Sequence, residues 1–245
     1  MSEYNELFTT RVRRETRKIH SVSDALVNAK FALSLRDETV WCGGLFAFYH
    51  IFAFLEDFKE RVHKPMYNKL FVSRVLYRKK AFEEDLTHYL GEDWRSAEKS
   101  PALQNYLDHL QFLENNKSIL LMAYVYHLYL GLLSGGQILA KKRRMFFNKN
   151  ASDQHVYVDK VTDFGNADIG KLKKDLHYAM NEVAELMTDS EKLSFIEESH
   201  EVFLRNNSIV KSIGGQDKVI YNMLYKTFAV LLFGVGAIFA YKMYK

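Results

Sequence analysis

The sequence is poor in the residues that break helices or cross-link a chain. Among its 245 residues there are two prolines, Pro65 and Pro101, and one cysteine, Cys42. A single cysteine excludes a disulfide within the chain and is typical of a reducing compartment. Few breakers favour long helices over a β architecture with many turns, and the length suffices for one large core. We therefore expect an all-α protein with a single main domain.

Several chemical signatures are also missing. The sequence has no H-E-x-x-H, no Cys-x-x-Cys and no P-loop, and no apolar signal segment opens it. Its net charge of +4 is too small to indicate a nucleic-acid partner, and we expect none. Basic residues cluster in "RVRRETRKIH" and "KKRRMFFNK". Such runs are usually solvated helix faces or charges at a helix C-terminus.

The C-terminal segment lacks charge. From Thr227 to Tyr241 no charged residue occurs, and lysines flank the run. Flanking tyrosines and lysines can lie at the headgroups and extend a short span, so we predict a transmembrane tail anchor. The alternative is a buried core helix. With an anchor, the chain divides into a body at 1–213, a linker at 214–225 and an anchor at 226–245. The short span suits the endoplasmic reticulum membrane, with the body in the cytosol.

The rest of the chain reads as consecutive helices. The N-cap candidate Asp37 begins the second, "GGQDK" at 214–218 is a hinge, and 150–168 has loop composition. The ranges that we predict to be helical are 4–31, 37–63, 67–90, 101–114, 117–143, 168–187 and 189–213.

One apolar helix, "YHLYLGLLSGGQILAKK", carries three glycines, Gly131, Gly135 and Gly136. Each costs about 1 kcal/mol against alanine in a helix interior. Glycine there permits a bend or a close approach of the backbone to a ligand. Tight packing of helices through small residues is the alternative.

The predicted first helix carries a polar stripe of Arg13, Arg17, His20 and Asp24, spaced four, three and four apart. Asp24 can accept the ring N–H of His20, which leaves the other nitrogen free as a ligand. The arginines can pair with carboxylates of a bound molecule. An exposed charged stripe is the alternative. One histidine is too little for zinc, but it is the right number for heme, which a flat glycine-lined helix face would also fit.

Five stretches carry a family resemblance. They are "ETRKIHSVSDALVNAKF", "FYHIFAFLED", "RKKAFEEDLTHYLG", "YLGLLSGGQIL" and "IEESHEVFLRN". In order and spacing they resemble the motifs of the heme oxygenases, over residues 5 to 213. The predicted tail anchor is similar to that of the membrane-tethered eukaryotic members. The resemblance implies one multi-helix domain that sandwiches heme between a proximal helix and a kinked distal helix.

The resemblance also implies roles for individual residues. His20 would ligate the iron, Asp24 would hold its ring, and basic residues such as Lys173 would bind the heme propionates. The glycine segment would be the distal helix, with Phe203 and Asn206 lining the pocket. The implied cofactor-binding residues are Arg13, Arg17, His20, Asp24, Tyr126, Leu132, Lys173, His177, Phe203 and Asn206. The implied catalytic residues are Gly131, Ser134, Gly135 and Gly136.

The activity implied by the resemblance is oxidative cleavage of heme b, which is both cofactor and substrate. The products are biliverdin, CO and ferrous iron, and the electrons come from NADPH–cytochrome P450 reductase. The run Lys141 to Arg144 could steer an acidic reductase, or it could be a charge cluster at the end of a helix.

Three positions depart from the family pattern. Leu132 stands where the family has an aspartate, Leu128 replaces an arginine, and His177 replaces an arginine that binds a propionate. Two functions therefore remain open. Other polar side chains could organise the distal water in a working oxygenase, namely Tyr126, His127, Tyr129 or Ser134. Alternatively, the protein is a heme carrier, a sensor or a peroxidase-like enzyme. A helical scaffold without heme is a third possibility.

Overall fold

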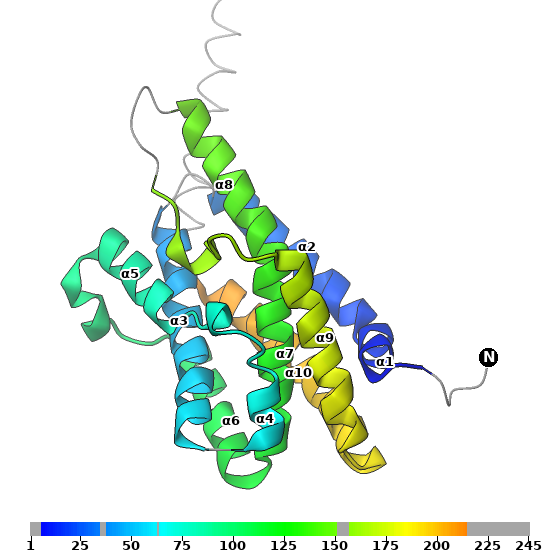
Figure 1. Cartoon of the computed structure of the whole chain (residues 1–245). Coiled ribbons are helices and arrows are strands. Elements are labelled where there is room, and N and C mark those ends of the chain that lie inside the picture. Colours follow the sequence, from blue (N-terminus) through cyan, green and yellow to red (C-terminus); the bar gives the residue numbers. More distant parts are fainter. Residues whose placement is uncertain (1–5, 35–37, 63, 151–156, 215–245) are drawn as a thin grey trace, which may run out of the picture.

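The computed structural model describes residues 6–34, 38–62, 64–150 and 157–214, and every regular element in these ranges is helical (Figure 1). The all-α prediction is confirmed for these residues. The predicted N-cap Asp37, most of the linker and the whole anchor lie outside them. The longer helices are α1 (Phe8–Glu15), α2 (Arg17–Ser34), α3 (Glu38–Arg61), α5 (Lys79–Leu90), α6 (Pro101–Asn116), α7 (Leu121–Gly131), α8 (Gln137–Asn150), α9 (Ile169–Glu185) and α10 (Asp189–Ser212). The short elements are α4 (Pro65–Lys69), η2 (Arg74–Leu76), η3 (Glu92–Ser96), η4 (Ser118–Leu120), η5 (Leu132–Gly136) and η6 (Lys160–Thr162).

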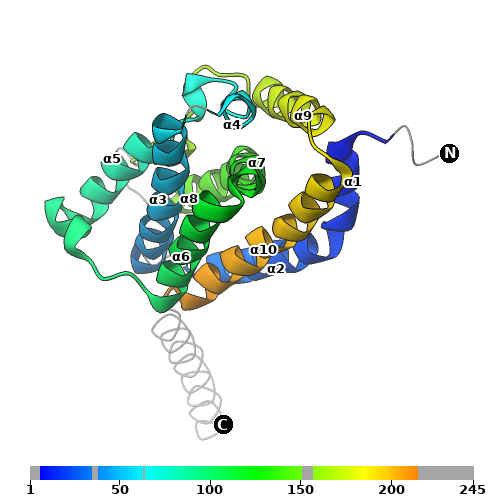
Figure 2. The same cartoon turned by 90° about the horizontal axis from the view of Figure 1, so that it is seen from below.

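Helix α7 is the centre of the molecule. Its residues from Leu121 to Tyr126 are all buried, because the helix is apolar on every side and other helices surround it. Figure 2 shows the molecule from below, with α3, α6, α9 and α10 placed around α7. By length and composition, Glu38–Arg61 and Ser118–Phe146 could each cross a membrane. Both supply much of the hydrophobic core, which accounts for their apolar character.

The predicted helix at 4–31 is wrong in one respect, because Thr16 divides it into α1 and α2. The Thr16 hydroxyl donates to the carbonyl of Val12 at 2.8 Å. A threonine that bonds back to the preceding turn commonly bends a helix. Arg13 and His20 therefore lie on two different helices.

The predicted helix at 67–90 is also wrong. It is divided into α4, η2 and α5, with extended backbone at Ser73 and Tyr77. The buried Glu56 of α3 accepts hydrogen bonds from the backbone N–H groups of Arg78 at 2.6 Å and Lys79 at 3.2 Å. These two N–H groups stand at the N-terminus of α5, where a helix has no internal acceptors for them. A buried carboxylate on another helix thus fixes where α5 begins.

Three predicted helix starts agree with local capping. Ser100 caps α6 and Asp168 caps α9, and each side chain accepts a backbone N–H. Thr188 and Glu191 form a reciprocal capping box at the start of α10. These starts were predictable because the signal lies within four residues of sequence.

The glycine segment does interrupt a long helix. Residues Leu132–Gly136, η5, form a π-helical turn between α7 and α8, and the three elements make one long rod in Figure 1. A π turn inserts an extra residue into a helix and commonly marks a functional site. The predicted irregularity at these glycines is therefore present.

Candidate functional site

The histidine and aspartate of α2 form the predicted pair. Nδ1 of His20 and Oδ2 of Asp24 are 3.0 Å apart, one helical turn from each other. Both side chains are more than half exposed. With Nδ1 donating to Asp24, the Nε2 lone pair of His20 remains available to a ligand.

The glycines of the α7–η5 segment serve two different purposes. A Cβ atom added to Gly131 or Gly135 would meet nothing within 4 Å, so these two positions border open space. A Cβ at Gly136 would lie 3.0 Å from Cδ1 of Leu132. Close packing of another helix against Gly131 and Gly135 is therefore excluded within the described residues. These two leave backbone uncovered, and Gly136 makes room for Leu132.

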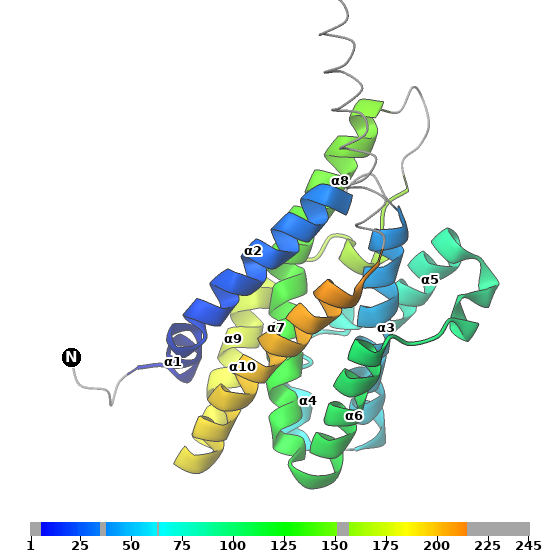
Figure 3. The same cartoon turned by 180° about the vertical axis from the view of Figure 1, so that it is seen from behind.

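Phe203 of α10 connects the two sides of the candidate site. Its ring contacts the imidazole of His20 edge to face, with centroids 5.2 Å apart, and that of His127 on α7, with centroids 5.1 Å apart. One turn further along α10, Asn206 accepts a hydrogen bond from the hydroxyl of Tyr106 at 2.9 Å. In Figure 3, α10 crosses in front of α7 with α2 alongside it. The predicted pocket residues Phe203 and Asn206 therefore lie on the helix that joins both sides.

A cluster suited to anions lies at one end of this site. Nδ1 of His177 and the hydroxyl of the buried Tyr126 are 2.8 Å apart. Burial, followed by the positive charges of Arg13 on α1 and Lys173 on α9, lowers the pKa of His177. The structure thus brings together residues from α1, α7 and α9. Two cations, a tyrosine and an imidazole can together bind carboxylates.

Other predicted residues stand outside these contacts. Arg17 is exposed on α2 and has no hydrogen bond or ion pair to the other candidates in the described chain. Ser134 is exposed on η5, whereas Leu132 is only partly buried and packs against the core.

The basic run at the end of the rod needs a correction. Arg143 is 4% exposed; its Nε lies 3.6 Å from Oδ2 of Asp159, and its guanidinium lies 4.8 Å over the Trp41 ring. It is therefore not part of a charged docking surface. Lys141 and Arg144 are exposed as expected.

Sequence reasoning also missed Tyr106, the hydrogen-bond donor to Asn206. Tyr106 is fully buried on α6, a hundred residues away in sequence, and reads there as an ordinary core position. No local pattern connects the two residues.

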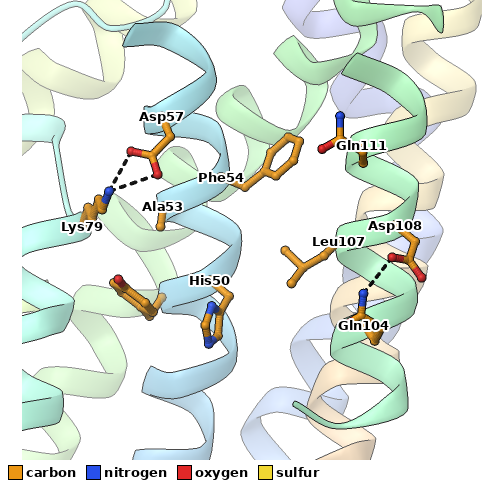
Figure 4. A pocket seen from close by; sticks show the side chains of 10 residues that line it. His50, Ala53, Phe54, Asp57, Lys79, Gln104, Leu107, Asp108 and Gln111 are labelled. Carbon is orange, nitrogen blue, oxygen red and sulfur yellow. Dashed lines mark hydrogen bonds and ion pairs between the residues drawn. The ribbon is translucent and has the colours of Figure 1, made fainter. Parts of the chain in front are cut away.

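A separate groove of about 440 Å³ lies between α3 and α6 (Figure 4). Its walls include His50, Ala53 and Phe54 on one helix and Leu107 on the other. No lining residue of this groove belongs to the candidate site. Its lysine is already paired, with Nζ of Lys79 2.7 Å from a carboxylate oxygen of Asp57.

Comparison with known proteins gives the site its context. The heme oxygenase family model matches residues 6–212. The chain belongs to the heme oxygenase family. It is 30% identical to the heme oxygenase of Pyropia yezoensis over 220 residues, covering 87% of this chain and 88% of that protein. It is 27% identical to human heme oxygenase 1 over 208 residues, covering 82% and 70% of the two proteins.

Solved structures agree with this assignment. Heme oxygenase 2 from Chlamydomonas reinhardtii, crystallised without heme, is 29% identical and superposes with a TM-score of 0.76, covering 85% of this chain and 98% of that chain. The heme complex of heme oxygenase-1 from Synechocystis has a TM-score of 0.77 at 24% identity, covering 91% and 100%. At that identity the second match shows the fold alone. Heme oxygenases degrade heme and bind it as substrate and prosthetic group.

The residues present fit heme. His20 has one ring nitrogen held by Asp24, and the backbone at Gly131 and Gly135 borders open space that a flat ligand can use. Arg13 and Lys173 supply the positive charge that propionates need.

Proposed function

We propose that this chain cleaves heme to biliverdin, CO and ferrous iron, using O₂ and electrons from NADPH–cytochrome P450 reductase. One observation carries the proposal. The ring of Phe203 on α10 contacts His20, which is paired with Asp24 on α2, and also His127, which lies one turn before the uncovered Gly131 on α7.

The chain's own residues would bind and orient the substrate. Bound heme supplies the iron at which O₂ is reduced and the ring that is opened. His20 would offer Nε2 to the iron, and Asp24 would hold the imidazole in one orientation by accepting a hydrogen bond from its Nδ1. Gly131 and Gly135 let the helix backbone approach the ring face without side chains between them.

The propionates would bind at the anion cluster. Arg13 and Lys173 provide charge, and the hydrogen-bonded pair of Tyr126 and His177 provides polar groups beside them. The lowered pKa of His177 keeps this ring neutral near pH 7, so it adds hydrogen bonding without charge. Propionate attraction therefore depends on Arg13 and Lys173.

The activity has a direct test. The full chain in detergent is incubated with heme, NADPH and the reductase, while biliverdin absorbance and CO release are followed. We expect both products to form at equal rates. If neither product forms and the porphyrin stays intact, the proposed activity is contradicted.

The reductase would approach the α8 side of the molecule. Lys141, Lys142 and Arg144 are exposed there, and Nζ of Lys142 lies 3.3 Å from Oδ1 of Asn28 on α2. Replacing Lys141 and Arg144 by glutamine should raise the reductase KM and flatten its dependence on salt. An unchanged KM would remove this surface from the proposal.

The anchor at 226–245 would tether the body to the endoplasmic reticulum membrane, with the body in the cytosol. The uncharged run from Thr227 to Tyr241 and its flanking lysines support this proposal. Alkaline extraction of cell membranes tests it. A full chain that is released like a variant ending at residue 214 would contradict an anchor.

One observation favours a second function, heme binding without ring opening. Leu128 and Leu132 leave the α7–η5 side without a carboxylate or guanidinium at these positions, and Leu128 is buried. Leu132→Asp distinguishes the two functions. If the missing acid blocks ring opening, the variant should gain biliverdin yield several-fold. If the natural chain already opens the ring, the gain should be absent.

A further inference from the structure

A working oxygenase needs polar groups that hold water beside the heme, and this chain has leucines at 128 and 132. Five other polar residues lie on α7 and η5. The Tyr124 hydroxyl is buried and donates to Glu198 at 2.6 Å. The Tyr129 hydroxyl is buried and donates to Glu56 at 2.7 Å, on the α3 side of the helix. The Tyr126 hydroxyl is paired with His177. Ser134 is exposed. His127 is the one left with an enclosed polar atom.

His127 is in an unusual state. Its Nε2 is inaccessible to solvent and has no hydrogen-bond partner among the described residues. An unpaired buried nitrogen is costly, and native proteins usually satisfy such groups with protein or ordered water. An enclosed polar atom without a protein partner is therefore a place where ordered water is expected.

The position of His127 on its helix places the residue beside the proposed heme site. Gly131 follows it by one helical turn and Gly135 by two, so the three share one helix face. On that face the glycines border open space. The His127 ring also packs on Phe203, the same ring that contacts His20.

We propose that His127 is a positioning residue that hydrogen-bonds water at the heme site, in place of the acid and arginine absent at Leu132 and Leu128. The inference rests on the proposed function. A neutral imidazole can both donate and accept hydrogen bonds, so it can hold a water molecule and pass a proton along it.

The ligand-free protein provides the first test. His127→Leu removes the unpaired nitrogen, so its melting temperature should be equal to or above that of the natural chain. His50→Leu is the matched control, because Nε2 of His50 is also buried without a partner but lines the groove between α3 and α6. A clearly lower melting temperature for His127→Leu alone would assign His127 a structural role and overturn the inference.

The ferric heme complex provides the second test, read from its absorption spectrum across pH. The midpoint at which iron-bound water loses a proton should move by about half to one pH unit in His127→Leu, the size expected for one hydrogen bond. It should stay in place in His50→Leu and return towards the natural value in His127→Gln. An unchanged midpoint in His127→Leu would overturn the inference. A natural chain that takes up no heme would overturn the proposed function first.

Discussion

At the scale of single residues, we expect the pair of His20 and Asp24 to act on orientation more than on stability. The side chains are 56% and 64% exposed, and exposed pairs contribute about 0–1 kcal/mol to folding. Partners that orient a ligating histidine commonly change metal affinity by about 10- to 100-fold. Stability and heme affinity should therefore respond differently to the loss of Asp24.

We expect Asp24→Ala to weaken heme binding about tenfold or more while changing the free energy of unfolding by less than about 1 kcal/mol. Heme transfer to a scavenging protein and urea denaturation measure the two effects. Asp175→Ala is the control. It also removes an exposed carboxylate that pairs with a basic side chain one helical turn away, in this case Lys171. Equal heme affinity in the Asp24 variant and the control would contradict the role of Asp24.

Which residues were predictable follows from the distance over which they interact. The His20–Asp24 pair is local, and its spacing of four residues was enough to predict it. The contact of Tyr126 with His177 joins two helices, and the family resemblance named both residues without showing that they touch. The burial of Arg143 depends on Trp41 and Asp159, which are distant in sequence, so its charge alone was misleading.

At the scale of helices, composition gave the right elements but not all of their limits. Capped starts such as Thr188 were predictable because the cap and its partner are three residues apart. The start of α5 depends on Glu56 from another helix, which no local pattern reveals. The break at Thr16 had a local cause, because a threonine hydroxyl can bond back to the carbonyl of the preceding turn. The same residue is also found in unbroken helices, so the sequence alone did not predict the break.

The three glycines of the long rod should behave differently. Gly131→Ala should raise the stability of the ligand-free protein by up to about 1 kcal/mol, because the added Cβ meets nothing. The same Cβ should lower heme affinity, because it occupies the uncovered face. Denaturation of the ligand-free protein and heme titration measure these opposite effects.

Gly136→Ala is the comparison, since its Cβ would lie 3.0 Å from Leu132. It should be less stable than Gly131→Ala, and adding Leu132→Ala should recover the difference. A Gly131→Ala protein with lower stability and unchanged heme affinity would contradict the assignment of this face.

At the scale of the whole molecule, buried histidines connect folding to pH. Burial, with smaller contributions from His20 and His200, lowers the pKa of His127 from 6.5 to about 3. Burial, with Lys99, lowers the pKa of His50 to about 4. Below pH 6.5, His127 and His50 therefore bind protons in the unfolded chain at pH values where they stay neutral in the folded chain. The stability present above pH 6.5 is lost as the pH falls towards these values.

We expect the ligand-free protein to lose about 2 kcal/mol for each of these two histidines between pH 7 and pH 5. Urea denaturation at both pH values measures this loss. A variant with His50→Leu and His127→Leu should show a clearly smaller loss. The same pH dependence in the variant and the natural chain would place both imidazoles in contact with solvent.

We propose that heme lies between α2 and the glycine-lined α7–η5 segment, with His20 bound to its iron. Resonance Raman spectroscopy of the ferrous heme complex, which detects the iron–histidine stretch, tests it most directly. The natural chain and the exposed control His88→Ala should show this band; His20→Ala should lack it until imidazole is added. An unchanged band in His20→Ala would show that the iron is held elsewhere.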